Sequence, residues 1–244
     1  MHKIGKYERN MKIQVHWNAD VTRRFPALSI CVGAINNVCN EKANDRIQEL
    51  SRTVYELVRA KYNVETLKND PTVRAYRDFY WKLNIDPTKT RPASEALLRR
   101  VLHGYELPSI STVVDAYNLA SMKTIIPISG FNSDRLNPPF QVRFATNGEV
   151  FTGIDMSKPA TLTDKTLVLT DEKQVLCVYP YRDSDHSKIT LQTHNVLIIA
   201  YGSPGITEKQ LRNAVETSLS YIEQTSQGEI TMTKVFSTTN DETS

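Results

Sequence analysis

The residues with the clearest chemical potential lie between positions 74 and 100, where seven Lys and Arg residues stand against three Asp and Glu residues. Cations contact phosphates and aromatic rings stack on bases, so such a stretch is able to bind nucleic acid. The rings of Tyr76, Phe79 and Tyr80, however, share helical spacing with Val73 and are expected in the core. Electrostatic contact with phosphate is therefore the chemistry that remains, and its candidates are Arg77, Lys82, Lys89, Arg99 and Arg100.

The predicted helix that ends at Gly104 has one apolar face, formed by leucine and valine residues at helical spacing. Because that face needs the core, Arg99 and Arg100 are expected to point towards solvent. Arg91 and Glu95 stand four residues apart around the start of the helix, a spacing at which opposite charges pair. We therefore expect this segment to be mainly architectural, with phosphate contacts on its exposed side.

The charge of the whole chain gives no support for a polyanionic partner, since the 244 residues carry a formal net charge of only +3. The content of 40% hydrophobic and 23% charged residues is ordinary for a soluble globular protein. The longest apolar runs are strand-sized, far below the roughly 20 residues of a membrane span, so no membrane association is expected. Residues 1–12 lack the apolar run of a signal peptide, and Cys31, Cys39 and Cys177 form no CxxC pair. The expectation is a cytoplasmic protein with reduced thiols.

The sequence lacks the motifs of several enzyme classes. It contains no glycine-rich phosphate loop, no Walker lysine motif and no GxSxG elbow. The five histidines are scattered without a cysteine at ligand spacing, so neither a metal site nor a cofactor is expected. Asp183 and Asp185 in "YRDSDHS" fit a turn better than a cation site, and Arg182 with Asp183 is able to form a simple ion pair.

Hydrophobic periodicity predicts an α+β fold in which strands come first, helices follow and strands return. The predicted strands are 12–17, 27–35, 141–146, 149–154, 166–171, 174–180, 195–202 and 229–236. Helices are predicted at 45–62, from Pro71, before Gly104, after Ser111 and from the Thr207–Gln210 capping box to Gly228. We expect an N-terminal α/β extension at 1–65 packed on a core domain at 66–228, then a terminal strand and disordered tail at 229–244.

Two long segments resemble a known family. "VRAYRDFYWKLNIDPTKTRPASEALLRRVLHGYELPSISTVVDAYNLASMKTIIPISGFN" is similar to the first half of the B3/B4 domain, the editing domain of the bacterial phenylalanyl-tRNA synthetase β subunit. "LVLTDEKQVLCVYPYRDSDHSKITLQTHNVLIIAYG" is similar to its second half. The resemblance covers roughly residues 66 to 225 and is closest to the free-standing branch of the family. It implies the α+β fold of that domain, with mixed sheets and packed helices around a small-molecule pocket.

The resemblance also implies a set of site residues. In the synthetase, the pocket receives the end of a tRNA that carries tyrosine by mistake, and the ester bond between the tRNA and the tyrosine is hydrolysed there. A family asparagine matches Asn118, and a family histidine matches Ser129 in a turn that reads "IPISGFN" here. A Gly-Gly turn matches roughly Asp183 and Ser184, and a glutamate that hydrogen-bonds the tyrosine hydroxyl matches Ile199. The expected catalytic residues are Ser129 and Asn118, and the expected substrate-binding residues are Ile199, Pro127, Gly130, Arg182, Asp183 and Ser184.

The departures from the family pattern bear on the substrate. Ile199 cannot accept a hydrogen bond, so an apolar acyl group suits this wall better than tyrosine does. Hydrolysis of an activated ester needs a placed water and donors for the developing oxyanion more than it needs a strong base. Ser129, Asn118 and the backbone amides of the "ISGF" turn are expected to supply them.

The leading hypothesis is a tRNA-binding B3/B4 protein that hydrolyses mischarged aminoacyl-tRNA in trans, with tRNA or aminoacyl-tRNA as its partner. Motifs for ATP or amino-acid activation are absent, so a complete aminoacyl-tRNA synthetase is not expected. The alternative is a non-catalytic module that binds a small amino-acid-like or acyl ligand on the same fold. A third hypothesis is an RNA-binding or protein-interaction domain whose pocket is vestigial.

Overall fold

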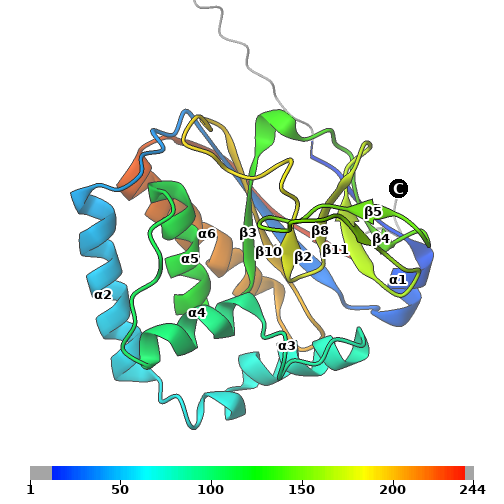
Figure 1. The fold of residues 1–244 in the computed structure, drawn as a ribbon, viewed down its shortest axis with the longest axis horizontal. Coiled ribbons are helices and arrows are strands. Elements are labelled where there is room, and N and C mark those ends of the chain that lie inside the picture. The colour runs from blue at the N-terminus through cyan, green and yellow to red at the C-terminus, as the bar shows by residue number, and fades with distance from the viewer. Residues whose placement is uncertain (1–12, 240–244) are drawn as a thin grey trace, which may run out of the picture.

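The computed structural model describes residues 13–239, and Figure 1 shows how its helices and strands are arranged. The α-helices are α1 (Ala19–Arg24), α2 (Asp45–Lys61), α3 (Pro71–Lys82), α4 (Ala93–Leu102), α5 (Thr112–Thr124) and α6 (Glu208–Ser226), with short 3-10 turns at Leu67–Asn69 and Ser133–Arg135. The strands are β1 (Val15–Trp17), β2 (Ser29–Asn36), β3 (Ile128–Asn132), β4 (Phe140–Phe144), β5 (Val150–Phe151), β6 (Ala160–Thr161), β7 (Leu167–Thr170), β8 (Val175–Val178), β9 (Arg182–Asp183), β10 (Val196–Tyr201) and β11 (Glu229–Ser237). The α+β class expected from the sequence is confirmed.

The elements form three layers. A four-stranded sheet of order β11-β2-β10-β3 lies in the middle of the molecule. Helices α5 and α6 pack on one of its faces, with α2 and α4 beside them, on the left in Figure 1. The five-stranded sheet of order β1-β4-β7-β8-β9 lies on the other face, and the small hairpin of β5 and β6 stands beside it. Along the described part of the chain, no helix is both long enough and apolar enough to cross a membrane.

Helices α2, α3, α5 and α6 begin where the sequence places capping residues. The side chain of Asn44 accepts a hydrogen bond from the backbone amide of Ile47 at the start of α2, and Asp70 does the same for α3 ahead of Pro71. The side chain of Ser111 caps α5, and Thr207 forms the predicted capping box at the start of α6. Each of these caps satisfies amides that the first helical turn leaves without a partner.

Alternation along β10 divides its side chains between two cores. Val196, Ile198 and Ala200 belong to the core under the helices, whereas Leu197, Ile199 and Tyr201 belong to the core between the two sheets. All six residues are buried, so the strand has no solvent-facing side. The middle sheet is therefore packed on both faces, and the face that a residue occupies follows from its position along the strand.

The N-terminal part of the chain belongs to the same layers as the rest. Strand β2 lies between β11 and β10, and β1 pairs in parallel with β4. Residues 13–65 thus contribute to both large sheets, and the boundary expected at residue 65 separates no layer of the fold; that division stays a prediction. Ser237 and Thr238 are buried, and the amide of Thr238 donates to the carbonyl of Leu28, so the expected tail is ordered up to this point. Residues 1–12 and 240–244, which carry the signal-peptide prediction and the end of the tail, lie outside the described residues.

The "ISGF" segment is a strand, and the prediction of a turn there was wrong. Ile128 to Asn132 form β3, which pairs antiparallel with β10 at the edge of the middle sheet. Gly130 is needed in this strand because the ring of Tyr117 packs directly on its backbone. A Cβ atom added at Gly130 would lie 2.5 Å from Cε1 of Tyr117. The glycine that suggested a turn instead permits a close approach between α5 and β3.

A buried carboxylate joins α3 to α4. Glu95 is fully buried, and its two oxygens accept hydrogen bonds from Nε of Arg77 at 2.8 Å and Nη2 of Arg77 at 2.5 Å. Nε of Arg99 donates to the same carboxylate at 2.8 Å. Burial favours the neutral acid, but the two guanidinium groups outweigh it and hold the pKa of Glu95 below its usual value. The expected pairing of Glu95 with Arg91 was wrong, and Arg99 is half-buried against Glu95 where it was expected to face solvent.

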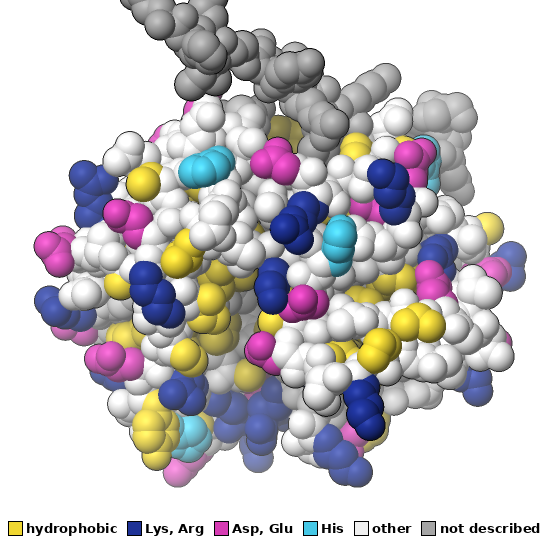
Figure 2. All heavy atoms as spheres, turned by 45° about the horizontal axis from the view of Figure 1, so that its top comes forward, with side chains coloured by type: hydrophobic (Ala, Val, Ile, Leu, Met, Phe, Trp, Pro, Cys, Tyr) yellow, Lys and Arg dark blue, Asp and Glu magenta, His cyan; other side chains and the backbone are white. Residues whose placement is uncertain are grey.

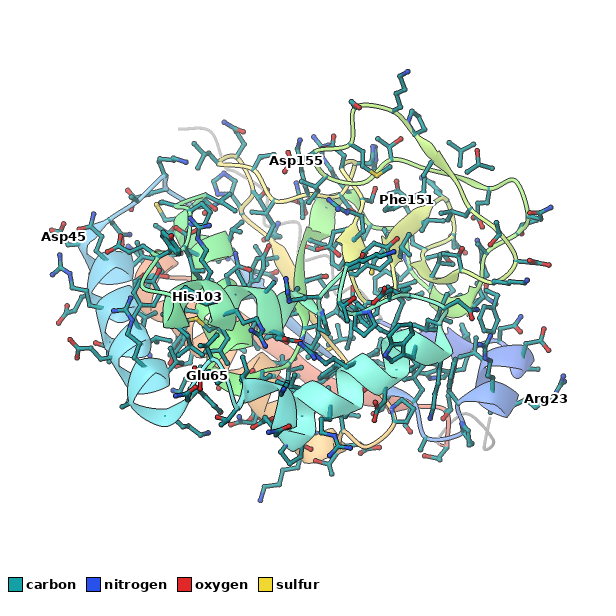
Figure 3. The ribbon with its side chains drawn as sticks, turned by 60° about the horizontal axis from the view of Figure 1, so that its bottom comes forward. Arg23, Asp45, Glu65, His103, Phe151 and Asp155 are labelled. Carbon is teal, nitrogen blue, oxygen red and sulfur yellow. The ribbon has the colours of Figure 1, made fainter. Side chains whose placement is uncertain are left out.

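We predict that Glu95→Ala lowers the free energy of unfolding by about 3 kcal/mol, because it leaves two partly buried arginines without their anion. Urea unfolding at neutral pH measures the change. The matched control is Glu65→Ala, since Glu65 is an exposed glutamate in the loop after α2 (Figure 3). The control should stay within about 0.5 kcal/mol of the wild type. Equal stability of the two variants would contradict a structural role for the Glu95 cluster.

Candidate functional site

One hydrogen bond crosses the apolar space between the two large sheets. Oγ of Ser129, on β3, donates to Oδ1 of Asp183, on β9, at 2.6 Å. Ser129 is buried and Asp183 keeps part of its surface exposed. Charged side chains are rarely found in such surroundings unless they are paired. The bond therefore marks a position where the interior of the protein departs from ordinary core packing.

Ile199 lies next to this bond. It is the cross-strand partner of Ser129 in the pairing of β3 with β10, so both side chains point to the same face of the sheet. Phe131, two residues further along β3, belongs to the core on that face. The structure thus brings together three of the residues expected at the site, Ser129, Asp183 and Ile199, with an apolar wall around the polar pair.

Two further polar side chains belong to this group and were missed by sequence reasoning. Cys177 on β8 is the cross-strand partner of Asp183, and its thiol lies beside the Asp183 carboxyl. The hydroxyl of Tyr201 lies beside Cys177 and Ser129, yet it makes no hydrogen bond of good geometry within residues 13–239. Tyr201 follows Ile199 by two positions, so strand alternation was a signal that it shares the same face. Cys177 carried no comparable signal, because its neighbour Asp183 lies on another strand.

The electrostatics of the group centre on Asp183. Burial raises the pKa of this carboxyl to about 6, although the hydrogen bond from Ser129, the thiol of Cys177 and the charge of Arg182 all favour the ionised form. Burial and the charge of Asp183 also raise the pKa of the Cys177 thiol well above its usual range. At neutral pH, Asp183 is therefore mainly a carboxylate, the thiol of Cys177 is neutral, and the hydroxyl of Ser129 is hydrogen-bonded to Asp183.

Strand β3, which carries Ser129, is the edge strand of the middle sheet. Tyr117 and Ile189 both lie against Gly130 on this edge strand. Burial first, and the charge of Asp183 second, raise the pKa of the Tyr117 hydroxyl above its usual range. On the face shown in Figure 2, hydrophobic side chains gather in a central depression with acidic and basic side chains around it.

The other residues expected to bind substrate lie around the group in different roles. Arg182 does not pair with Asp183: its Nη1 donates to the carbonyl of Ile154 at 3.2 Å. Ser184 is buried, and its Oγ accepts from the amide of His186. The carbonyl of Pro127 accepts from the amide of Tyr201, which makes Pro127 part of the sheet edge.

Asn118 lies in a different place from Ser129. It lines a cavity of about 320 Å³ between α2, α5 and the loop before α5, together with Tyr55, Leu107 and Asp115. Ser129 is not among the residues that line this cavity. The residue of α5 that faces β3 is Tyr117, one position earlier. The expected pair of catalytic residues is therefore not brought together in the structure.

The five cations expected to contact phosphate fall into two groups. Arg77 and Arg99 are engaged by Glu95, with 22% and 21% of their side chains exposed. Lys82, Lys89 and Arg100 are exposed, although Nε of Arg100 donates to the carbonyl of Glu106 at 2.7 Å. The exposed group is thus the one available to a polyanion. For metals, the described residues contain no cluster of three or more His, Cys, Asp or Glu side chains able to hold an ion.

The chain is similar in sequence to β subunits of a tRNA ligase. The phenylalanine–tRNA ligase β subunits of Pectobacterium atrosepticum and Yersinia pestis are each 32% identical to the chain over 133 residues. The match covers 54% of this chain and 17% of each relative, so the chain spans a small part of their length. An N-terminal fragment of the phenylalanyl-tRNA synthetase β subunit from Pyrococcus horikoshii matches with a TM-score of 0.48 at 12% identity, over 90% of this chain and 50% of the fragment.

A family model carries the assignment. The model of the B3/4 domain matches residues 75–227, which is more than half of the chain and includes Ser129, Asp183 and Ile199. It also spans most of α3, the whole of α4, α5 and α6, and the strands between them. The chain therefore belongs to the B3/4 domain family.

Proposed function

We propose that this protein binds aminoacylated tRNA and hydrolyses a mischarged aminoacyl ester in trans. The observation that carries the proposal is the group formed by Ser129, Asp183 and Ile199. These are the positions at which the resemblance to the synthetase editing domain expects substrate contacts. The names of the relatives, which are β subunits of a tRNA ligase, support tRNA as the partner.

The chemistry assigned to Ser129 follows from its hydrogen bond. Because Oγ donates its proton to Asp183, its lone pairs are left to accept a hydrogen bond from a water molecule. The oxygen of that water bonds to the carbonyl carbon of the ester, and the bond between this carbon and the ribose oxygen breaks. One proton of the water passes to the ribose oxygen, and the other leaves with the released amino acid, whose carboxyl group gives it up to solvent. Placement of the water supplies most of the acceleration, since the ester is already activated. Ser129 acts as a positioning group for the nucleophile in this scheme.

The surroundings of Ser129 define the acyl group. Ile199 and Phe131 present hydrocarbon beside it, and neither of these two side chains is able to accept a hydrogen bond from a substrate hydroxyl. An apolar acyl side chain gains from this contact, whereas a hydroxylated one loses its hydrogen bonds to water without replacement. The substrate class we propose is therefore tRNA charged with an amino acid whose side chain is apolar.

The first test is ester release from a panel of tRNAs charged with different amino acids. We expect release of an apolar aminoacyl group above the spontaneous rate, reduced roughly a hundredfold in Ser129→Ala, because one positioning hydrogen bond is removed. Ser220→Ala is the matched control, since Ser220 lies on α6 at the far face of the sheet and should release at the wild-type rate.

Two results would count against this scheme. Release in none of the charged tRNAs would remove the hydrolase function and leave the small-ligand binding module in its place. An equal loss of release in Asn118→Ala would show that Asn118 acts with Ser129, although the two residues line different places in the structure.

A second test concerns the tRNA contact. We expect Lys82→Ala, Lys89→Ala and Arg100→Ala each to weaken binding of uncharged tRNA and to lower the slope of log affinity against log salt by about 1. Lys209→Ala, an exposed lysine on α6, is the control and should keep the wild-type slope. Fluorescence anisotropy across a salt series measures both quantities. Wild-type slopes in all three variants would exclude this surface as the phosphate contact.

A further inference from the structure

We propose that Asp183 binds the ammonium group of the ligand, so that the site selects a primary amine attached to an apolar side chain. The inference rests on the proposed function, because it names the substrate group that this site recognises. It assigns amine recognition to a carboxylate and leaves placement of the attacking water to Ser129. Three properties of Asp183 support it: its charge, its remaining hydrogen-bonding capacity and its access to solvent.

Asp183 is an anion without a cationic partner in the described part of the chain. No Lys, Arg or His side chain of residues 13–239 lies within salt-bridge distance of it. Its neighbour Arg182 donates to the carbonyl of Ile154 and packs its stem against Gly153. Carboxylates in such surroundings are normally paired, so a ligand ammonium would supply the charge that the protein does not.

The carboxylate also keeps hydrogen-bonding capacity. Two carboxylate oxygens offer about four acceptor positions, and the Ser129 hydroxyl and the Cys177 thiol are the side chains directed at them. An ammonium group has three donors and no acceptor, which matches a site made of acceptors. Beside it, the buried hydroxyl of Tyr201 has no hydrogen-bond partner in residues 13–239, and its oxygen is able to accept another of these donors.

Asp183 differs from its polar neighbours in its exposure to solvent, and an apolar side chain lies beside them. Asp183 keeps part of its surface exposed, whereas Ser129, Cys177 and Tyr201 are buried, so Asp183 is the member of the group that a ligand meets from solvent. Ile199 lies directly across from Ser129 and offers hydrocarbon contact. A ligand with an ammonium group next to an apolar chain fits both features. The α-amino ester of an apolar amino acid, the substrate class proposed above, is such a ligand.

The charge of Asp183 predicts a pH dependence. The groups that face it are Arg182 on β9, Cys177 on β8, Tyr201 on β10 and Tyr117 on α5. Burial raises the pKa of the thiol and of both phenols above their usual ranges, so these groups stay neutral through the physiological range. The pKa of Asp183 is raised to about 6, so affinity for an amine should be full above this pH and fall about tenfold for each pH unit below it.

The test uses n-butylamine as the probe and n-butanol as its uncharged counterpart, with chemical-shift titration of the whole protein. We expect the wild type to bind the amine roughly ten- to a hundredfold more tightly than the alcohol, and Asp183→Asn to lose this preference. Asp185→Asn is the matched control, because Asp185 is a neighbouring carboxylate already paired with Nζ of Lys188 at 2.7 Å. No preference for the amine in the wild type, or an unchanged preference in Asp183→Asn, would overturn the inference.

A measurement on the wild type alone removes any dependence on the folding of a variant. The carboxyl carbon of Asp183 should titrate near pH 6, and n-butylamine should shift this midpoint downwards while n-butanol leaves it in place. The direction follows because a bound cation favours the ionised acid. A midpoint that does not move at saturating amine would equally overturn the inference.

Amide-linked aminoacyl-adenosines separate this inference from the proposed function. Tight binding of an apolar aminoacyl-adenosine, weakened at least tenfold by N-acetylation of its amine or by Asp183→Asn, supports both. Selective binding of n-butylamine, without binding of any aminoacyl-adenosine, would sustain amine recognition and refute the tRNA-linked function. Equal binding of acetylated and free analogues would sustain the nucleoside partner and refute amine recognition by Asp183.

Discussion

The middle sheet is packed on both faces, and the positions of Ser129, Ile199 and Tyr201 follow from that constraint. Along β3 and β10, alternate side chains enter either the core under α5 and α6 or the core between the sheets. Ser129, Ile199 and Tyr201 enter the second of these, where β9 delivers Asp183 from the facing sheet. A slip of one residue in β10 would turn Ile199 and Tyr201 towards the helical core, and the same slip in β3 would turn Ser129 there, away from Asp183. The register of the sheet thus determines whether the site exists.

Two carboxylates in this protein show how partners distinguish structure from function. Glu95 is fully buried and receives three hydrogen bonds from two arginines, so its charge is balanced inside the fold and its pKa is lowered. Asp183 receives a hydroxyl and a thiol but no cation among the described residues, and burial raises its pKa to about 6. Glu95 has no need of a ligand, whereas Asp183 gains from any cation that reaches it. Charge balance, more than burial, separates the two.

Local patterns predicted the elements well, and contacts between distant segments less well. The caps at Asn44, Ser111 and Thr207 marked helix starts because capping depends on neighbouring residues. The strand at Ile128–Asn132 was missed because its glycine serves a contact with a ring on another element. Arg99 was expected in solvent because helical periodicity does not show which residues bind a buried charge. Arg99 in fact pairs with the buried Glu95 on the same helix, and Arg77 on α3 pairs with it too.

The same limit explains the candidate site. The resemblance indicated Ser129, Asp183 and Ile199, but their joining depends on a hydrogen bond across 54 positions of the chain, which no local pattern contains. It also indicated Asn118. Adjacent side chains on an α-helix point about 100° apart, and here it is the preceding residue, Tyr117, that packs against β3. The resemblance expects Ile199 where the synthetase has an acceptor, and Asp183 with Ser184 where it has a glycine pair. If Asp183 binds the amine as proposed, the buried anion contacts the amine of the substrate, where the synthetase glutamate contacts the hydroxyl of its side chain. A site with Ile199 and Asp183 in these positions discriminates less in favour of a substrate hydroxyl and more in favour of a free ammonium group. Each preference depends on where a hydrogen-bond acceptor is buried.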